Sequence, residues 1–202
     1  MVTDQLAHEP TTRTRTKHRG AFIEMLISSA LGLVASLVLA SDAIVLAANP
    51  NADLSCNLNT NISCGTVGTS WQASLLGFPN AFLGLMAEPV IITIAVASLG
   101  GVLFPRWFMN IAQAVSSIGF VFAYWLFYEA YFVIGALCPW CLLITVTTTF
   151  VFVSMSRVNI LDGNLGSYLQ RKLTPALRYN ADTWTGVLLV AVVTAMVVYR
   201  YL

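Results

Sequence analysis

Five long apolar stretches decide what this chain of 202 residues can fold into. They cover residues 21–47, 80–103, 108–133, 137–156 and 184–202. A helix needs about 20 predominantly apolar residues to cross the hydrocarbon core of a bilayer, and each stretch approaches or exceeds that length. Charged residues make up only 9% of the chain and the mean hydropathy is +0.77, which is outside the range of water-soluble domains. The sequence therefore predicts an all-α integral membrane protein embedded in a lipid bilayer.

Basic residues are distributed unevenly among the connections between these stretches. Nine of the ten Lys and Arg residues lie before the first stretch, between the second and third, or between the fourth and fifth. The loop of residues 48–79 contains no Lys or Arg. Because basic residues are retained on the cytoplasmic side, the pattern predicts a cytoplasmic N-terminus and an external loop. In a bacterium this membrane is the plasma (inner) membrane. The net charge of +1 gives no reason to expect nucleic acid as a partner.

The four cysteines form two pairs. Cys56 and Cys64 lie in the external loop, whereas Cys138 and Cys141 belong to a Cys-Pro-Trp-Cys motif where the fourth apolar stretch begins. Pro139 suits the first turn of a helix, so Cys138 is expected at or near the N-cap, where the helix dipole stabilises a thiolate. Both pairs are predicted on the same side of the membrane, which in a bacterium is oxidising.

Each cysteine pair also has an interpretation that involves no redox relay. The polar segment between Cys56 and Cys64 can bend back to close a disulfide, and that disulfide could be purely structural. The second pair could serve packing or bind a metal, and four thiolates together could bind zinc. An oxidising compartment and the lack of a nearby His argue against a metal, so we predict none. Two pairs on one side favour a redox relay over a non-catalytic protein with two structural disulfides or a thiol-ligated metal carrier.

The order of these motifs resembles the vitamin K epoxide reductase family in its bacterial form. The resemblance covers about residues 21–156 and is carried by Cys56, Cys64, Ser70, Trp71, Asn80 and the CxxC motif that opens the fourth stretch. The CxxC motif follows the other pair here, whereas it comes first in the unrelated quinone-linked thiol oxidase DsbB. The resemblance implies a bundle of four transmembrane helices around a quinone pocket, with a fifth transmembrane helix outside it.

The resemblance also implies roles for single residues. Cys141 is the sulfur next to the quinone, Cys64 is the loop cysteine that attacks Cys138, and Cys56 exchanges with a thioredoxin-like (DsbA-like) protein. The implied cofactor is a menaquinone, a ubiquinone or a vitamin K analogue. Its predicted contacts are Asn80 at a ring carbonyl, Ser70, Trp71, Thr145, and Phe82 as aromatic surface near the outer half of the bundle. Thr145 replaces a Tyr of the animal enzymes, which puts epoxide reduction in doubt more than quinone reduction.

The chain is accordingly divided into four segments. We expect a disordered cytoplasmic tail at 1–20, a catalytic domain at 21–156 with the external loop 48–79, a cytoplasmic connector at 157–182 and the fifth helix at 183–202. A fused thioredoxin-like domain is not seen, so the partner is expected to be a separate protein. The predicted function is a membrane thiol oxidoreductase that generates disulfides in this partner and passes the electrons through two cysteine pairs to a quinone.

Overall fold

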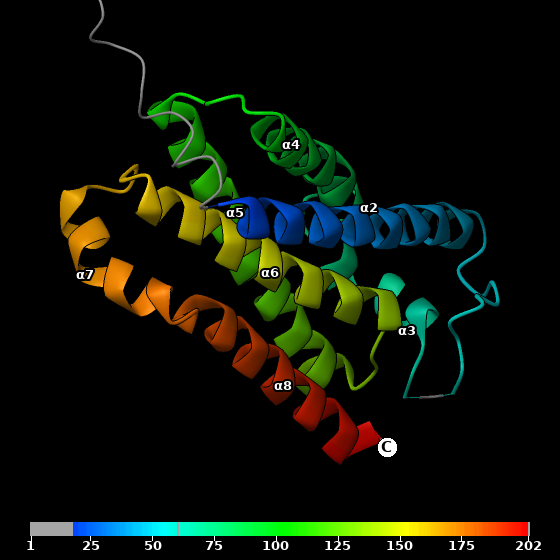
Figure 1. The fold of residues 1–202 in the computed structure, drawn as a ribbon. Coiled ribbons are helices and arrows are strands. Elements are labelled where there is room, and N and C mark those ends of the chain that lie inside the picture. The colour runs from blue at the N-terminus through cyan, green and yellow to red at the C-terminus, as the bar shows by residue number, and fades with distance from the viewer. Residues whose placement is uncertain (1–17, 60, 202) are drawn as a thin grey trace, which may run out of the picture.

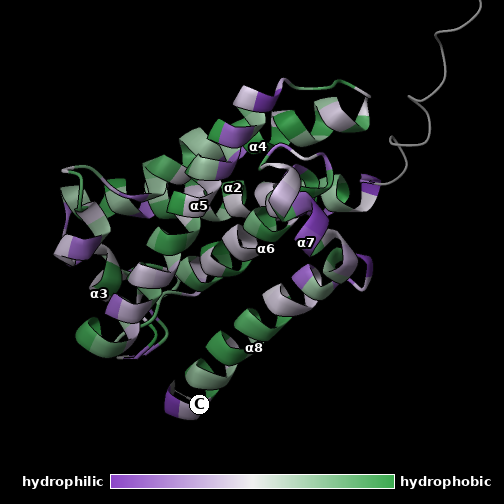
Figure 2. Ribbon diagram, turned by 90° about the vertical axis from the view of Figure 1, so that its left-hand side faces the viewer, coloured by the Kyte–Doolittle hydropathy of each residue, from purple (hydrophilic) through white to green (hydrophobic). Residues whose placement is uncertain are grey.

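The computed structural model describes residues 18–59 and 61–201, so most of the predicted disordered tail lies outside the described residues. Five helices in this part of the chain are long and apolar enough to cross a membrane. They are α2 (Arg19–Ala48), α4 (Ala81–Leu99), α5 (Arg106–Tyr128), α6 (Pro139–Leu161) and α8 (Ala181–Tyr201). Hydrophobic residues dominate their length, and hydrophilic residues gather at their ends and on α7 (Ser167–Arg178) (Figure 2). The prediction of an all-α, multi-pass membrane protein is confirmed.

Helices α2 and α6 form the centre of the bundle. Helix α2 packs against α4 and α6, and α6 also contacts α5 and α8 (Figure 1). The third and fourth spans, α5 and α6, are therefore neighbours in the bundle. Helix α8 lies on the outer side of α6, away from α2, and so stands outside the four-helix core. We call the end of the bundle where α2 ends and α6 begins the cysteine end.

Small side chains let α2 approach its neighbours closely. They recur three or four residues apart on its buried face, the spacing of one side of a helix. They are Ala21, Ser28, Ser29, Gly32, Ala35, Ser36 and Ala40. A Cβ added to Gly32 would lie 2.6 Å from Oε1 of Glu88 on α4, and one added to Gly84 of α4 would lie 2.9 Å from Cβ of Ser36. Helix association in a membrane depends on such close packing, since lipid is as apolar as the helices.

Local backbone chemistry sets the helix ends and moves some of them from the predicted positions. Helix α4 ends at Leu99 rather than at residue 103, because Gly100 and Gly101 follow and Gly101 adopts a φ of 97°, which only glycine adopts freely. Helix α6 continues to Leu161 rather than ending at residue 156. Helix α5 extends through a π-helical turn, η2 (Glu129–Ile134), and stops at Gly135 with a φ of 75°.

The predicted connector 157–182 contains the last turn of α6 and the helix α7. Helix α7 is amphipathic, as expected for a helix at a membrane surface. The far end of α8 returns to the cysteine end, where the hydroxyl of Tyr131 in η2 donates a hydrogen bond to the carbonyl oxygen of Met196 at 3.2 Å. At its near end Asp182 pairs with Arg157 of α6, so the fifth helix is attached to the core at both of its ends.

We expect Gly84→Ala to destabilise the bundle by about 1–3 kcal/mol, the usual cost of overpacking a tight interface. The new methyl group would meet the Cβ of Ser36, which is fixed to the backbone and cannot rotate away. The measurement is the thermal unfolding midpoint of the purified protein in detergent. Gly119→Ala is the matched control, because nothing lies within 4 Å of a Cβ at that position. Ser36→Gly should restore stability in the Gly84→Ala background, and equal effects at both glycines would contradict the packing argument.

Candidate functional site

Backbone hydrogen bonds fix the loop beside Cys64 to the start of α6. The N–H of Ser63 donates to the carbonyl oxygen of Leu137 at 3.0 Å, and the N–H of Leu137 donates to that of Asn61 at 2.9 Å. These bonds form an isolated parallel β-bridge between Ile62 and Leu137. Residues 64 and 138 follow directly after the paired segments, so the bridge sets the two cysteines side by side.

The four sulfur atoms are gathered at this bridge. Cys56 and Cys64 form a disulfide with a Cα–Cα distance of 5.7 Å, whereas Cys138 and Cys141 are free thiols. Sγ of Cys138 lies 3.1 Å from Sγ of Cys64, and both residues are buried. A thiol in contact with a disulfide sulfur is the arrangement from which thiol–disulfide exchange proceeds. The geometry permits attack of Cys138 on Cys64, with release of Cys56, and the reverse of that step.

Cys138 is held in surroundings that favour its thiolate. It is the N-cap of α6, and Pro139 occupies the first helical turn as the sequence predicts. The thiol of Cys141 donates a hydrogen bond to Cys138, and with the backbone N–H groups of Trp140 and Cys141 it holds the pKa of Cys138 below its ordinary value despite burial. The charge of Asp42 acts in the opposite direction. The thiolate is the reactive form in disulfide exchange.

Asn57 holds the loop in shape, a role that the sequence analysis missed. Its Oδ1 accepts hydrogen bonds from the hydroxyl of Ser63 and from the N–H of Gly65, both at 3.0 Å. The Ser63 hydroxyl in turn accepts from the N–H of Thr66 at 3.2 Å and caps the short helix α3 (Cys64–Gly68). One side chain therefore connects the residue after Cys56 to both neighbours of Cys64. An Asn beside a cysteine in a turn-rich segment was the available signal.

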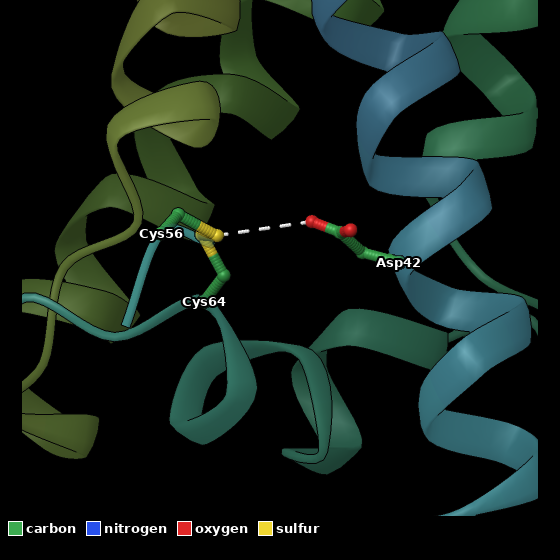
Figure 3. Close-up of side chains that lie close together, drawn as sticks. All are labelled: Asp42, Cys56 and Cys64. Carbon is green, nitrogen blue, oxygen red and sulfur yellow. Dashed lines mark hydrogen bonds between the residues drawn. A yellow bond between two sulfur atoms is a disulfide. The ribbon is translucent and has the colours of Figure 1, made fainter. Parts of the chain in front are cut away.

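Asp42 is the second residue that the sequence analysis did not assign to the site. It lies near the end of α2. Its Oδ2 is 3.8 Å from Sγ of Cys56, and the carboxylate points toward the disulfide (Figure 3). One ligand atom each from Asp42, Cys56 and Cys64 lies within 4.8 Å of the others. The disulfide leaves neither sulfur as a thiolate, which a metal would require, so this group is not a metal site in the state described.

The predicted quinone contacts are divided between two groups. Asn80 precedes α4, and its Nδ2 donates to the carbonyl oxygen of Gln72 at 2.6 Å, while its Oδ1 is buried without a partner. Thr145 is buried one turn after Cys141 and donates to the Cys141 carbonyl oxygen at 3.0 Å. The Ser70 hydroxyl donates to the carbonyl oxygen of a neighbouring turn, that of Val67, at 2.6 Å.

The two predicted aromatic contacts pack against other rings. Trp71 lies in η1 (Trp71–Ser74), is 63% exposed, and has its ring centroid 6.3 Å from that of Trp125. Phe82 stacks on Phe78 with a centroid distance of 6.5 Å. This exposure places Trp71 at the surface of the bundle rather than inside it. The segment around Trp71 is one short 3₁₀ helix followed by turns.

Asn80 is the residue whose present contacts fit a quinone best. An amide has two N–H donors and one carbonyl acceptor, and only one donor is used by Gln72. A buried polar atom without a partner is costly, so the vacant Oδ1 and the second N–H suit a ligand that carries both acceptor and donor oxygens. A quinone and its quinol offer both. Asn80 would hold the ring oxygen, and Thr145 would lie close to the thiol of Cys141.

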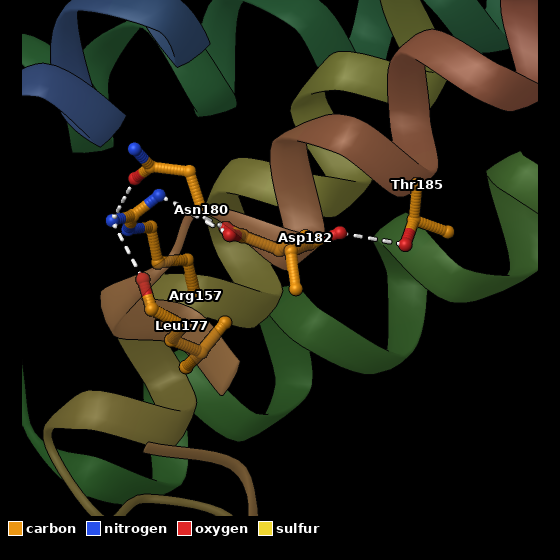
Figure 4. A network of polar contacts seen from close by, with 6 residues as sticks. Arg157, Leu177, Asn180, Asp182 and Thr185 are labelled. Atoms are coloured by element: carbon orange, nitrogen blue, oxygen red, sulfur yellow. Dashed lines mark hydrogen bonds and ion pairs between the residues drawn. The ribbon is translucent and has the colours of Figure 1, made fainter. Parts of the chain in front are cut away.

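A second polar cluster lies at the opposite end of the bundle and serves a structural role. Arg157 of α6 pairs with Asp182 of α8 at 3.2 Å and donates to Oδ1 of Asn180 at 2.8 Å and to the carbonyl oxygen of Leu177 at 3.2 Å (Figure 4). These contacts attach α7 and α8 to the core. A surface cavity of about 570 Å³ is lined by residues of α7, among them Tyr168. Neither feature contacts the cysteines.

Comparison with known protein families matches residues 23–156 to the vitamin K epoxide reductase family. The matched region is more than half of the chain and includes all four cysteines. It also includes Asp42, Asn57 and Asn80, and it ends before α7 and α8. Comparison with curated proteins gave no match.

We expect the hydrogen bond from residue 141 to decide the acidity of Cys138. In a Cys56→Ser/Cys64→Ser background, Cys141→Ser and Cys141→Ala each leave Cys138 as the single cysteine. Serine keeps a donor for the thiolate and alanine does not, so the serine variant should ionise at lower pH. Thiolate absorbance at 240 nm, followed below pH 9, measures the titration. Identical titrations would show that the bond from Cys141 does not set the pKa of Cys138.

Proposed function

The chain belongs to the vitamin K epoxide reductase family, and we propose that it is a membrane thiol oxidoreductase that generates disulfides in a thioredoxin-like partner and passes the electrons to a quinone. The observation that carries the proposal is the 3.1 Å contact between the Cys138 thiol and the Cys56–Cys64 disulfide. The five apolar helices and the family support a membrane oxidoreductase. The two cysteine pairs in contact support a relay between them.

The first exchange takes place between the partner and the loop pair. A thiolate of the reduced partner attacks Sγ of Cys56, the Cys56–Cys64 bond breaks, and Cys64 leaves as a thiolate. The partner's second thiol then attacks the partner's first sulfur, which is bonded to Cys56 in the mixed disulfide, and Cys56 is released. The partner is now oxidised, and the loop pair holds its two electrons.

The second exchange takes place between the two pairs of this chain. The Cys64 thiolate attacks Cys138 of an oxidised Cys138–Cys141 pair and releases Cys141. Cys56 then attacks Cys64, which restores the loop disulfide and releases Cys138 as a thiolate. The bonds in the structure, a loop disulfide beside two free thiols, are those reached when this exchange is complete. The pair of Cys138 and Cys141 then carries the electrons.

A bound quinone, of the menaquinone, ubiquinone or vitamin K type, supplies the two-electron acceptor that a pair of thiols cannot provide. We assign Cys141 as the thiol that faces it, since Cys141 lies inside α6 beyond Cys138. Asn80 holds the ring oxygen, and Ser70, Trp71, Phe82 and Thr145 are further candidate contacts. The animal enzymes have a Tyr at the position of Thr145, and Thr145 lacks its phenol group. We therefore propose quinone reduction in place of epoxide reduction.

The charge distribution along the bundle supports an external cysteine end. Arg106, Arg157 and the basic residues of α7 lie at the opposite end, whereas the loop 48–79 has no Lys or Arg. We therefore place the N-terminus and the connector 157–182 in the cytoplasm of a bacterium, the catalytic domain 21–156 and the helix 183–202 in its plasma membrane, and both cysteine pairs outside. A DsbA-like protein on that side would be the electron donor.

Anaerobic quinone reduction tests the proposal. Wild type should reduce a short-tailed ubiquinone with a reduced thioredoxin-like protein as donor, and Cys64→Ala and Cys141→Ala should both lose this activity. Dithiothreitol provides the matched control, because a small dithiol can reduce the Cys138–Cys141 pair directly. We expect dithiothreitol to restore activity to Cys64→Ala and not to Cys141→Ala. Full activity of Cys64→Ala with the protein donor would make the loop disulfide a structural one.

The relay also predicts an asymmetry between cysteine variants. Cys56→Ala lacks the thiol that resolves the second exchange, so a Cys64–Cys138 disulfide should accumulate, as the 3.1 Å contact of their sulfurs allows. Cys138→Ala should instead retain the Cys56–Cys64 disulfide. Acid quenching, alkylation of free thiols and mass spectrometry of proteolytic peptides identify the bonds. Two purely structural disulfides would give no trapped species in either variant.

A further inference from the structure

We propose that Asp42 is the general base that takes the proton of the Cys56 thiol as Cys56 re-forms the loop disulfide. This inference rests on the proposed function and names one more residue that acts on the reacting atoms. The relay described above needs Cys56 as a nucleophile once in every cycle. A thiol must lose its proton to act in this way.

The position of Asp42 suits this task. Its Oδ2 lies 3.8 Å from Sγ of Cys56, near the end of α2 and facing the disulfide (Figure 3). A disulfide sulfur carries no hydrogen, so this contact can be a hydrogen bond only if the carboxyl group is protonated and donates. A protonated Asp42 is what remains after it has taken the proton from Cys56. Hydrogen bonds of catalytic bases are often long before the reacting state and shorten in it.

Cys56 lacks the aids that ionise Cys138. Cys138 caps a long helix and receives a hydrogen bond from Cys141, whereas Cys56 lies in a loop segment that precedes α3. Residues 48–79 include no Lys, Arg or His that could stabilise its thiolate or take its proton. Asp53, the one carboxylate of this loop, is exposed. The carboxylate of Asp42, in contrast, contacts the Cys56 sulfur through Oδ2.

The step balances without any outside reagent. It begins from the Cys64–Cys138 mixed disulfide, with Cys56 as a thiol. The proton of Cys56 moves to Oδ2 of Asp42, the Cys56 sulfur attacks that of Cys64, the Cys64–Cys138 bond breaks, and its electron pair stays on Cys138. When the thiols of the partner later release Cys56, Asp42 returns the proton to it. In the structure the loop disulfide contacts both Sγ of Cys138 and Oδ2 of Asp42, the contacts expected when the step is complete.

One proton transfer assists both ends of the exchange. The negative charge of Asp42 raises the pKa of Cys138, so it opposes release of Cys138 as a thiolate. Protonation of Asp42 removes that opposition at the moment when Cys138 leaves. The base thus activates the nucleophile and improves the leaving group. An asparagine at position 42 would leave the Cys138 thiolate unopposed but could not activate Cys56.

The groups that face Asp42 from the packed elements are the cysteines. Cys56 comes from the loop and Cys64 from α3. Cys138 comes from the start of α6, together with Cys141, whose thiol is hydrogen-bonded to it. Helix α4 carries Glu88, which meets α2 at Gly32. At 1.5 Å of rise per residue, that position is about 15 Å along α2 from Asp42. The pH dependence at this site therefore reports on Asp42 and the cysteines.

The test follows the Cys64–Cys138 intermediate during turnover with reduced thioredoxin and short-tailed ubiquinone. Samples are quenched in acid, alkylated and analysed by mass spectrometry between pH 6 and 9. In Asp42→Asn we expect resolution of the intermediate at pH 6.5 to slow by about 100-fold, the lower limit of the usual rate contribution of a general base. The intermediate should therefore accumulate. It should decline as the pH rises toward 9, because a thiol of pKa about 8.5 then ionises unaided. Asp42→Glu and the control Asp53→Asn should behave as wild type.

Three results would overturn the assignment or the relay, and they can be told apart. If Asp42→Asn accumulates no more intermediate than Asp53→Asn, Asp42 is not the base. Accumulation that does not change with pH would make Asp42 a positioning residue. If Cys56→Ala itself fails to trap the Cys64–Cys138 bond, the proposed relay fails, whatever Asp42 does. If Asp42→Asn does not fold, the rate at which wild type resolves the Cys64–Cys138 intermediate is compared in water and in deuterium oxide. A slower rate in deuterium oxide supports proton transfer in this step, and an unchanged rate opposes it.

Discussion

The backbone pairing of residues 61–63 with Leu137 is the interaction on which the site depends. Two membrane-crossing helices separate Cys64 from Cys138 along the chain, yet two hydrogen bonds set their sulfurs 3.1 Å apart. Ser63 and Leu137 are buried, and buried backbone groups cannot be left unpaired without a cost, so this register is strongly held. Asn57 and the Ser63 cap hold the same segment from the other side. The loop disulfide is thereby held against Cys138, the thiol with which we propose that it exchanges.

Backbone conformation determines the structural role of each residue that leads into α6. Gly135 ends η2 in a left-handed conformation, Leu137 makes the bridge, and Cys138 caps the helix that Pro139 begins. Each residue has one task, and a shift of one position would separate Cys138 either from the residue that makes the bridge or from the N-cap position. The helix N-terminus and the thiol of Cys141 then stabilise negative charge on Cys138. The same few residues that end one span and begin the next also make the reactive thiol.

Sequence reasoning predicted the spans well because hydropathy and length are local properties. It also brought the two cysteine pairs to one end of the bundle, since the number of spans between them decides the side. Helix ends were less predictable, as α4 shows at Gly100, because they depend on single glycine conformations. The contact of Asp42 with Cys56 was not predictable, because it requires the path of the loop back across the end of α2, which no periodic pattern records.

The two pairs differ in how they carry charge, and this difference favours one direction of flow. A disulfide is a stronger oxidant when its reduced form is stabilised. The reduced inner pair is stabilised because Cys138 holds its negative charge at a helix N-terminus beside the Cys141 donor. The loop pair has no such support, and Asp42 beside Cys56 disfavours a thiolate there unless it takes the proton itself. This difference in charge stabilisation supports our proposal that electrons move from the loop pair to the inner pair, at the start of α6.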